Sequence, residues 1–122
     1  MRTIKQSNRV TIIGARYVTL RSYGAYVAQI DKDKGTLTLG YLWHYSQTTW
    51  QHVRKFIKDY IEHLTIWSED DELTQVYTAA HDWMIKMLTA KNGRAYMQTL
   101  IDNGIIPTES DCTLYDRMID DN

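Results

Sequence analysis

The chain has 122 residues, of which 43% are hydrophobic and 24% are charged, and its formal net charge is −1. This length and composition allow a folded domain with its own core and exclude a disordered or low-complexity chain. The near-zero total conceals a split, because residues 1–59 carry ten Lys and Arg against three Asp, whereas residues 60–122 carry four against twelve acidic residues. Such asymmetry indicates a charged partner.

The cysteine count and the hydropathy pattern narrow the classes further. Cys112 is the single cysteine, which excludes an intramolecular disulfide and a cysteine zinc site. The first residues lack the apolar segment of a signal peptide, and no apolar run approaches the roughly 20 residues that span a bilayer. We therefore expect a cytoplasmic protein that has no membrane partner.

The first third of the sequence predicts β-strands. Four segments are rich in β-branched residues or alternate between apolar and polar side chains: residues 10–13, 16–23, 25–31 and 36–43. Gly24 and the turn-forming residues 31–35 separate the later segments. Because two strands alone are marginally stable, these segments predict an antiparallel meander of three to four strands.

The remainder of the sequence predicts helices. Thr48 and Gln51 have the spacing of a capping box, with Ser46 as a competing N-cap, and an apolar stripe follows up to Leu64. Similar patterns of caps and apolar stripes predict further helices in three segments: residues 68–92, 94–102 and 108–119.

Strands followed by helices without alternation predict an α+β fold rather than a parallel α/β sheet. The expected architecture is an N-terminal antiparallel three- to four-stranded meander followed by three to four helices. We expect residues 1–122 to form a single domain. Residues 1–45 would be mainly β and basic, and residues 46–122 mainly α and acidic in their second part.

No pattern in the sequence indicates catalysis, a metal or a cofactor. The four histidines lack the spacing of a zinc site, and no nucleophile motif surrounds a serine or threonine. Consecutive carboxylates at residues 69–72 point in different directions around a helix and lack the turn glycine of a calcium loop. This acidic cluster is explained by a solvated helix start or by a surface that mimics nucleic acid.

The basic half contains a more specific pattern. Arg54, Lys55 and Lys58 fall on the helix side opposite the predicted apolar stripe, and Arg21 and Tyr23 share one face of a predicted strand. Lysine and arginine neutralise phosphates, and aromatic rings stack on exposed bases. The competing interpretation is that the aromatic residues are core packing and the charges a solvated face.

Two segments, residues 20–28 and 45–56, carry motifs that resemble a family of small bacteriophage and mobile-element proteins. The motifs are a Ser-Tyr-x-x-x-Val-Ala strand, here Ser22 to Ala28, and a Tyr-Ser-x-Thr-Thr-x-x-His-x-x-x-Phe helix start, here Tyr45 to Phe56. The resemblance implies no activity. It implies a context in which small accessory proteins bind host machinery, including CRISPR effectors.

The first hypothesis is a non-enzymatic phage or mobile-element protein that binds and inhibits a host nucleoprotein in the host bacterial cytoplasm, such as an anti-CRISPR inhibitor of an RNA-guided nuclease. The alternative is an accessory phage protein that binds nucleic acid through a basic aromatic surface. Charge-driven self-association, as in a homodimer, is a third interpretation. The candidate binding residues are Arg21, Tyr23, Tyr45, Trp50, His52, Arg54, Lys55, Lys58, Glu69, Asp70, Asp71 and Glu72.

Overall fold

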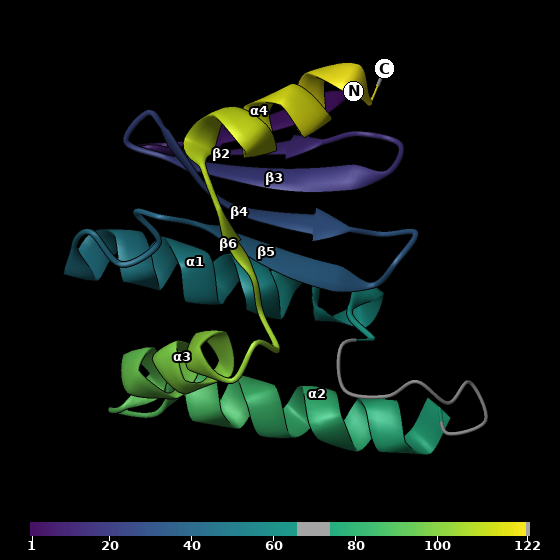
Figure 1. Ribbon diagram of the computed structural model, residues 1–122, viewed down its shortest axis with the longest axis vertical. Coiled ribbons are helices and arrows are strands. Elements are labelled where there is room, and N and C mark those ends of the chain that lie inside the picture. Colours follow the sequence, from purple (N-terminus) through teal and green to yellow (C-terminus); the bar gives the residue numbers. More distant parts are fainter. Residues whose placement is uncertain (66–73, 122) are drawn as a thin grey trace.

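A computed structural model describes residues 1–65 and 74–121 of the chain and confirms an α+β fold in which strands come first (Figure 1). Its elements, in chain order, are β1 (Arg2–Gln6), β2 (Arg9–Ile13), β3 (Tyr17–Ser22), β4 (Ala25–Asp31), β5 (Thr36–Gly40), α1 (Gln47–Asp59), the 3₁₀ turn η1 (Ile61–His63), α2 (Thr74–Thr89), α3 (Gly93–Asp102), β6 (Thr108–Glu109) and α4 (Asp111–Asp120). None of the helices in these described residues has the length and apolar character needed to cross a membrane.

The sheet is larger than the predicted meander of three to four strands. It is mixed and has six strands in the order β1-β2-β3-β4-β5-β6, with β6 added to β5 in parallel. The two strands missed by the prediction are the edges. Most of β1 is polar and exposed, so it carries no apolar alternation, and β6 has only two residues. That prediction was wrong because neither edge carries the sequence pattern of a half-buried strand.

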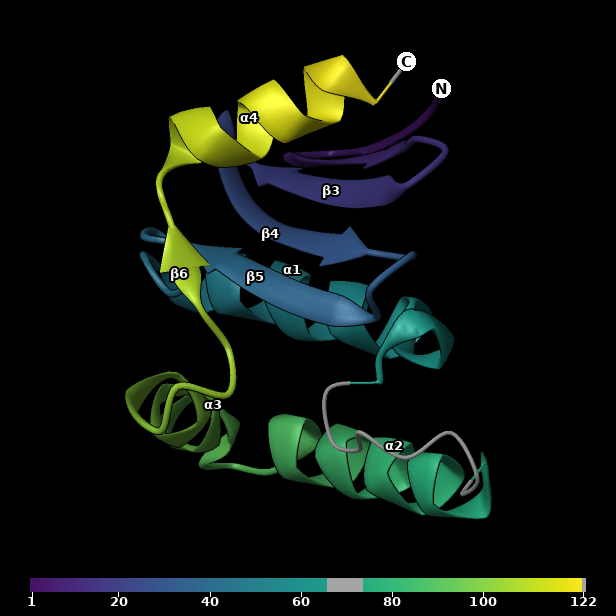
Figure 2. The same ribbon diagram turned by 45° about the vertical axis from the view of Figure 1, so that its right-hand side comes forward.

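Helices cover both faces of the sheet, α1 on one and α4 on the other (Figures 1 and 2). Neighbouring strand residues show this, because successive side chains point to opposite faces. Leu20 lines a small cavity together with Phe56 of α1, whereas the adjacent Thr19 accepts a hydrogen bond from Gln29, which also bonds the α4 backbone. The order of the layers is therefore α1, sheet, α4.

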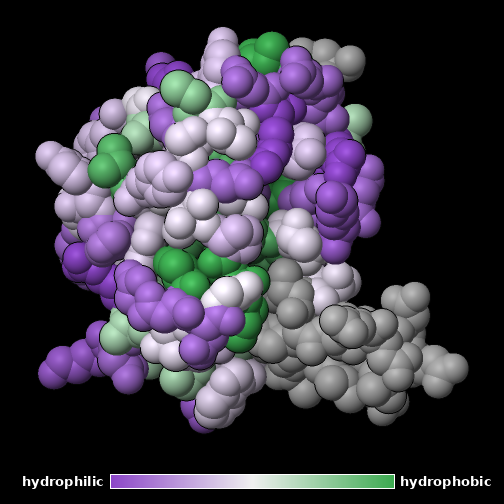
Figure 3. Space-filling view, in the orientation of Figure 1, coloured by the Kyte–Doolittle hydropathy of each residue, from purple (hydrophilic) through white to green (hydrophobic). Residues whose placement is uncertain are grey.

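The main hydrophobic core lies on the α1 face and continues into α2 and α3. On the surface seen in Figure 3, hydrophobic residues gather between β5 and these two helices. Burial along such an interface is the largest stabilising contribution to the fold. The buried side chains include Val18, Leu20, Ile30, Leu37 and Leu39 from the strands, Trp50, Val53, Phe56 and Ile57 from α1, and Met84, Leu88, Met97 and Leu100 from α2 and α3.

Serine hydroxyls cap the two helices that cover the sheet. Ser46 Oγ accepts from the Thr49 amide at 3.1 Å, and Ser110 Oγ accepts from the Thr113 amide at 3.2 Å. The predicted capping box at Thr48 was wrong, since Thr48 lies inside α1 and the competing candidate Ser46 is the N-cap. The predicted acidic start of the second helix lies outside the described residues.

α4 returns the acidic end of the sequence onto the basic sheet. The Asp121 carboxylate accepts from the backbone amides of Arg16 and Tyr17, at 2.9 Å in each case. At the other end of α4, Asp111 accepts from the Tyr26 amide. At α4, acidic residues from the second half of the chain therefore lie against the basic first half. Self-association driven by two oppositely charged ends would require these halves to lie apart.

Candidate functional site

The turn between β3 and β4 holds an aromatic residue in an unusual conformation. Tyr23 and Gly24 both have positive φ, 52° and 89°, the pattern of a type I′ turn. Asn, Asp and Gly usually occupy such positions, because a left-handed conformation costs other residues about 1–2 kcal/mol. The Tyr23 side chain is nevertheless 57% exposed. Strained residues of this kind concentrate at functional sites, so Tyr23 is the starting point for a candidate site.

His52 of α1 supports the Tyr23 ring. The two rings stack with centroids 6.0 Å apart and an interplanar angle of 28°. The Nδ1 atom of His52 lies 2.8 Å from Oγ of the buried Ser22, which fixes the plane of the imidazole. Burial and the nearby Arg9 guanidinium lower the pKa of His52, so its ring is neutral at pH 7. The Tyr23 ring therefore stacks on a neutral imidazole whose orientation is held by Ser22.

Two concave regions meet at Tyr23. The first, of about 410 Å³, is lined by Lys5 and Arg21, which lack ion-pair partners among the described residues. The second, of about 120 Å³, is lined by apolar and aromatic residues that include Leu42 and the 79% exposed Tyr45, and by Ser22 and Thr49. We call this combined region, Lys5, Arg21, Tyr23, Leu42, Tyr45 and the supporting His52, the Tyr23 surface.

The predicted binding residues fall into four groups. Arg21, Tyr23, Tyr45 and His52 come together in the Tyr23 surface. Trp50 does not, since it is 3% exposed and contacts Trp43 edge to face at 5.5 Å, which makes it core packing. The remaining predicted residues are Arg54, Lys55 and Lys58 on the outer side of α1, and the acidic cluster Glu69, Asp70, Asp71 and Glu72, which lies outside the described residues.

The cations on α1 form a separate surface from Tyr23. Lys55 and Lys58 are exposed and Arg54 is partly buried, as the helical spacing predicts. Lys55 pairs with Asp59 at 3.5 Å, a contact between exposed side chains that is worth only a few tenths of a kcal/mol. The two concave regions at Tyr23 have none of these three cations among their lining residues.

Sequence reasoning missed Lys5 and Leu42. Lys5 was missed because β1 was not predicted, although Ser7-Asn8 between two short polar segments is a signal for a tight hairpin turn. Leu42 was missed because the predicted strand ran to Trp43, whereas β5 ends at Gly40 and residues 41–42 turn outward, exposed.

A third concave region lies between the segment before α1 and the start of α3. It measures about 430 Å³ and is lined by Trp43, His44, Gln98 and two exposed cations, Lys91 and Arg94. Burial and the Arg94 guanidinium lower the pKa of His44. Two of the four basic residues in the acidic half of the chain thus gather at one groove.

The Ser22–His52 pair resembles half of a nucleophilic site. Ser22 is only 2% exposed, and among the described residues no carboxylate hydrogen-bonds the His52 ring to orient it as a base. The described residues also contain no group of three or more potential metal ligands. The role of Ser22 in this geometry is structural: its hydrogen bond orients the His52 ring on which Tyr23 stacks.

A mixed six-stranded sheet with helices on both faces defines an α+β protein. The chain belongs to a family of unknown function, DUF8033, whose model matches residues 2–71. The matched segment contains β1 to β5 and α1, and with them every residue of the Tyr23 surface. No curated protein and no solved structure matches the chain.

Proposed function

We propose that this protein is a non-enzymatic binding protein that contacts single-stranded nucleic acid through the Tyr23 surface. One observation carries the proposal: Tyr23 joins a hollow lined by the unpaired cations Lys5 and Arg21 to an aromatic pocket at Tyr45. Cations neutralise backbone phosphates, and exposed rings stack on bases that are not paired in a duplex. Because successive strand residues point to opposite faces, Arg21 lies on the α4 face and the pocket at Tyr45 lies on the α1 face, and Tyr23 in the hairpin turn borders both.

The arrangement favours binding that tolerates many sequences. Every base has a face on which Tyr45 can stack, whereas base-specific readout needs polar side chains aligned with base edges. The polar groups around Tyr23, from Ser7 and Asn8, lie in a turn beside the cations. We therefore expect affinity to depend on strandedness and salt more than on sequence.

Fluorescence anisotropy with a labelled oligothymidylate of about 15 nucleotides tests the proposal, since single-strand sites span roughly 4–16 nucleotides. We expect affinity to fall steeply with salt and to be lower for a duplex of the same length. Tyr45→Ala removes a stacking ring and should weaken binding about tenfold. Arg21→Glu should weaken it further at low salt and flatten the salt dependence.

Two matched variants control for these effects. Tyr115→Ala removes another exposed tyrosine, 43% exposed on α4, and Lys86→Glu makes the same change of net charge as Arg21→Glu on α2. Both should bind as the wild type does. If the controls weaken binding as much as Tyr45→Ala and Arg21→Glu, or if the wild type does not bind, the Tyr23 surface is not the site.

Tyr23→Asn separates binding from folding. Asparagine suits the left-handed position better than tyrosine, so we expect the variant to be at least as stable as the wild type, although it loses the stack on His52. Binding should nevertheless fall, because the residue that joins the two concave regions is gone. A variant that keeps full affinity would exclude a role for the Tyr23 ring.

Inhibition of a host nucleoprotein by a phage or mobile-element protein is the second candidate. It is favoured by the exposed run between β5 and α1, where Tyr41 is 64%, Leu42 49% and Tyr45 79% exposed, since such side chains anchor protein partners. A pull-down from bacterial lysate distinguishes the two. A defined protein, such as an RNA-guided nuclease, retained after nuclease treatment supports inhibition, whereas capture that nuclease abolishes supports direct nucleic-acid binding.

A further inference from the structure

β1 leaves one edge of the sheet open. It is the first strand in the order of the sheet and pairs only with β2 among the described residues (Figures 1 and 2). The Tyr23 amide donates to the Asn8 carbonyl at 2.9 Å, so Asn8 and, by alternation, the even-numbered residues of β2 bond toward β3. The odd-numbered residues of β2 therefore bond β1, and the register pairs them with the even-numbered residues of β1. The N–H and C=O groups of Thr3 and Lys5 consequently point outward, in position to pair with a further strand.

A cavity lies beside this edge on the α1 face of the sheet. It measures about 140 Å³, and β1 contributes Ile4 and Gln6 to its wall. The buried side chains of Leu20 and Phe56 give it an apolar surface. The rest of the wall is more polar and consists of Arg9, Thr11, His52, Asp59 and Tyr60. Because an apolar cavity of about 150 Å³ holds a benzene ring, this one has room for a single aromatic side chain. We call β1 together with this cavity the β1 edge.

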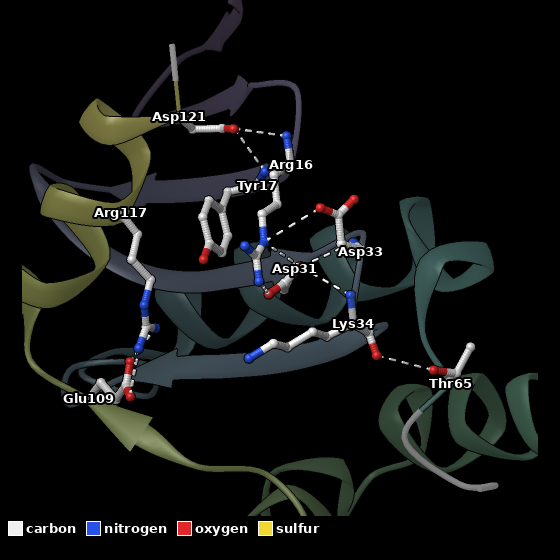
Figure 4. Close-up of polar contacts among 9 residues, drawn as sticks. All are labelled: Arg16, Tyr17, Asp31, Asp33, Lys34, Thr65, Glu109, Arg117 and Asp121. Atoms are coloured by element: carbon white, nitrogen blue, oxygen red, sulfur yellow. Dashed lines mark hydrogen bonds and ion pairs between the residues drawn. The ribbon is translucent and has the colours of Figure 1, made fainter.

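The basic residues at the β1 edge have no acidic partner. Arg2, Lys5 and Arg9 lack ion-pair partners in the part of the chain that the structure describes, whereas the carboxylate at the cavity, Asp59, is paired with Lys55 at 3.5 Å. Figure 4 shows the opposite arrangement near α4, where each arginine bonds a carboxylate: Arg16 with Asp31 and Arg117 with Glu109. The β1 edge therefore favours an acidic partner.

We propose that the β1 edge binds an extended acidic segment of a partner protein as an antiparallel seventh strand of the sheet. Main-chain hydrogen bonds to Thr3 and Lys5 would supply affinity, and one aromatic side chain on the α1 face would enter the cavity and supply specificity. A second copy of the chain is disfavoured as the partner, because pairing two β1 edges brings Arg2 and Lys5 of both copies together. The β1 edge meets the Tyr23 surface at Lys5, but the proposal does not rest on nucleic-acid binding.

NMR titration of the ¹⁵N-labelled full chain with a synthetic peptide tests the proposal. The peptide Glu-Thr-Glu-Phe-Glu-Thr-Glu is acidic and carries one aromatic ring, and a peptide with lysine in place of every glutamate is the charge control. We expect saturable shifts of the Thr3 and Lys5 backbone amides with the acidic peptide and none with the control. Replacing the phenylalanine of the peptide by serine should weaken binding about tenfold, because the cavity is left unfilled.

Two N-methylated forms of the acidic peptide separate strand pairing from charge attraction. With the phenylalanine on the α1 face, the amides of the two glutamates beside it face Thr3 and Lys5, whereas the amides of the two threonines point away from β1. Methylation of those two glutamate amides should therefore weaken binding about tenfold or more, and methylation of the two threonine amides should leave it unchanged. The two forms have the same charge and the same number of methyl groups.

Substitutions in the chain test the same edge from the other side. Thr3→Pro removes an outward N–H that β2 does not use, and edge strands tolerate proline at such positions, so we expect a folded variant that binds about tenfold more weakly. Thr3→Ala keeps the N–H and should bind as the wild type does. Arg2→Glu should also weaken binding, whereas Lys86→Glu on α2 makes the same change of net charge and should not.

Two results on the wild type would overturn the proposal, and neither needs a variant to fold. One is the absence of saturable shifts at Thr3 and Lys5 with the acidic peptide. The other is equal binding of the two methylated forms, which would mean that charge alone attracts the peptide and that no strand is added to β1.

Discussion

The two faces of the central sheet are built from alternate residues of the same strands but have opposite chemistry. Toward α1, the paired rows are apolar and buried: Val18, Ile30 and Leu37 in one row, and Leu20, Ala28 and Leu39 in the next. Toward α4, the neighbouring rows are polar: Tyr17, Asp31 and Thr36, and Thr19, Gln29 and Thr38. The same strand pairing thus places a hydrophobic core on one face of the sheet and a polar interface on the other.

The comparison shows that coverage by a helix does not require an apolar face. Burial of the α1 face stabilises the fold by removing apolar surface from water. The α4 face needs a partner for each polar group it buries, because an unpaired one is costly. Asp31 and Asp121 have such partners, whereas Gln29 Oε1 has none among the described residues. The α1 face contributes most of the buried apolar surface, and the α4 face contributes hydrogen bonds and an ion pair.

The largest expected difference between the faces comes from two adjacent residues of β3. Leu20→Ala should lower the free energy of unfolding by about 3 kcal/mol, since it leaves a cavity under α1. Thr19→Val keeps the volume and removes one acceptor of the Gln29 amide, which should cost about 1 kcal/mol. Urea denaturation of both variants measures the difference. Equal costs would mean that the two faces contribute alike.

Breaking the charged contact on the α4 face should have a smaller effect. Burial alone would raise the pKa of Asp31, but hydrogen bonds from Arg16 and from the amides of Lys34 and Asp33 hold that pKa below its ordinary value. Asp31→Asn should therefore cost about 2 kcal/mol at pH 7. Asp33→Asn is the matched control, because the Asp33 side chain is 69% exposed and 3.7 Å from Arg16; it should change stability little.

The pH dependence of this contact has a defined sign. Because the folded pKa of Asp31 lies below the unfolded value of about 3.9, the stabilisation is complete above that value and is lost as pH falls through the folded pKa. The difference between wild type and Asp31→Asn should thus be constant from neutral pH down to about pH 5 and shrink below pH 4. A difference that persists undiminished at pH 2 would contradict the role of the charge.

The two faces of the sheet also differ in how well the sequence predicts them. The α1 face was predictable because both of its partners carry strong local patterns, the alternation of Val18 and Leu20 and the stripe of Trp50, Val53 and Ile57. The α4 face was not, since alternating polar residues such as Tyr17 and Thr19 indicate a solvent-exposed face. Only a helix about ninety residues further along the chain, which local patterns cannot place, covers them.

The candidate site likewise combines features that local sequence indicates with features that depend on distant segments. Arg21, Tyr23 and Tyr45 were identified by residue type, because cations and aromatic rings suit nucleic-acid contacts, whereas burial of the aromatic residues was left open. The positive φ of Tyr23 and its stack on His52 depend on contacts between distant segments, so local sequence patterns do not indicate them.

The smallest expected effect on stability comes from removing the N-cap of either helix that covers the sheet. α1 and α4 start with the same local arrangement, a serine whose Oγ accepts from the amide and contacts the hydroxyl of the threonine three residues later. Ser46→Ala and Ser110→Ala should each cost about 1 kcal/mol, the usual cost of losing an N-cap. The consequences should differ, however. Hydrogen exchange after Ser110→Ala should accelerate at Gln29 and Thr38, because a frayed α4 uncovers the polar face, whereas Ser46→Ala should leave those amides protected. Equal acceleration in both variants would mean that α4 does not cover the polar face of the sheet independently of α1.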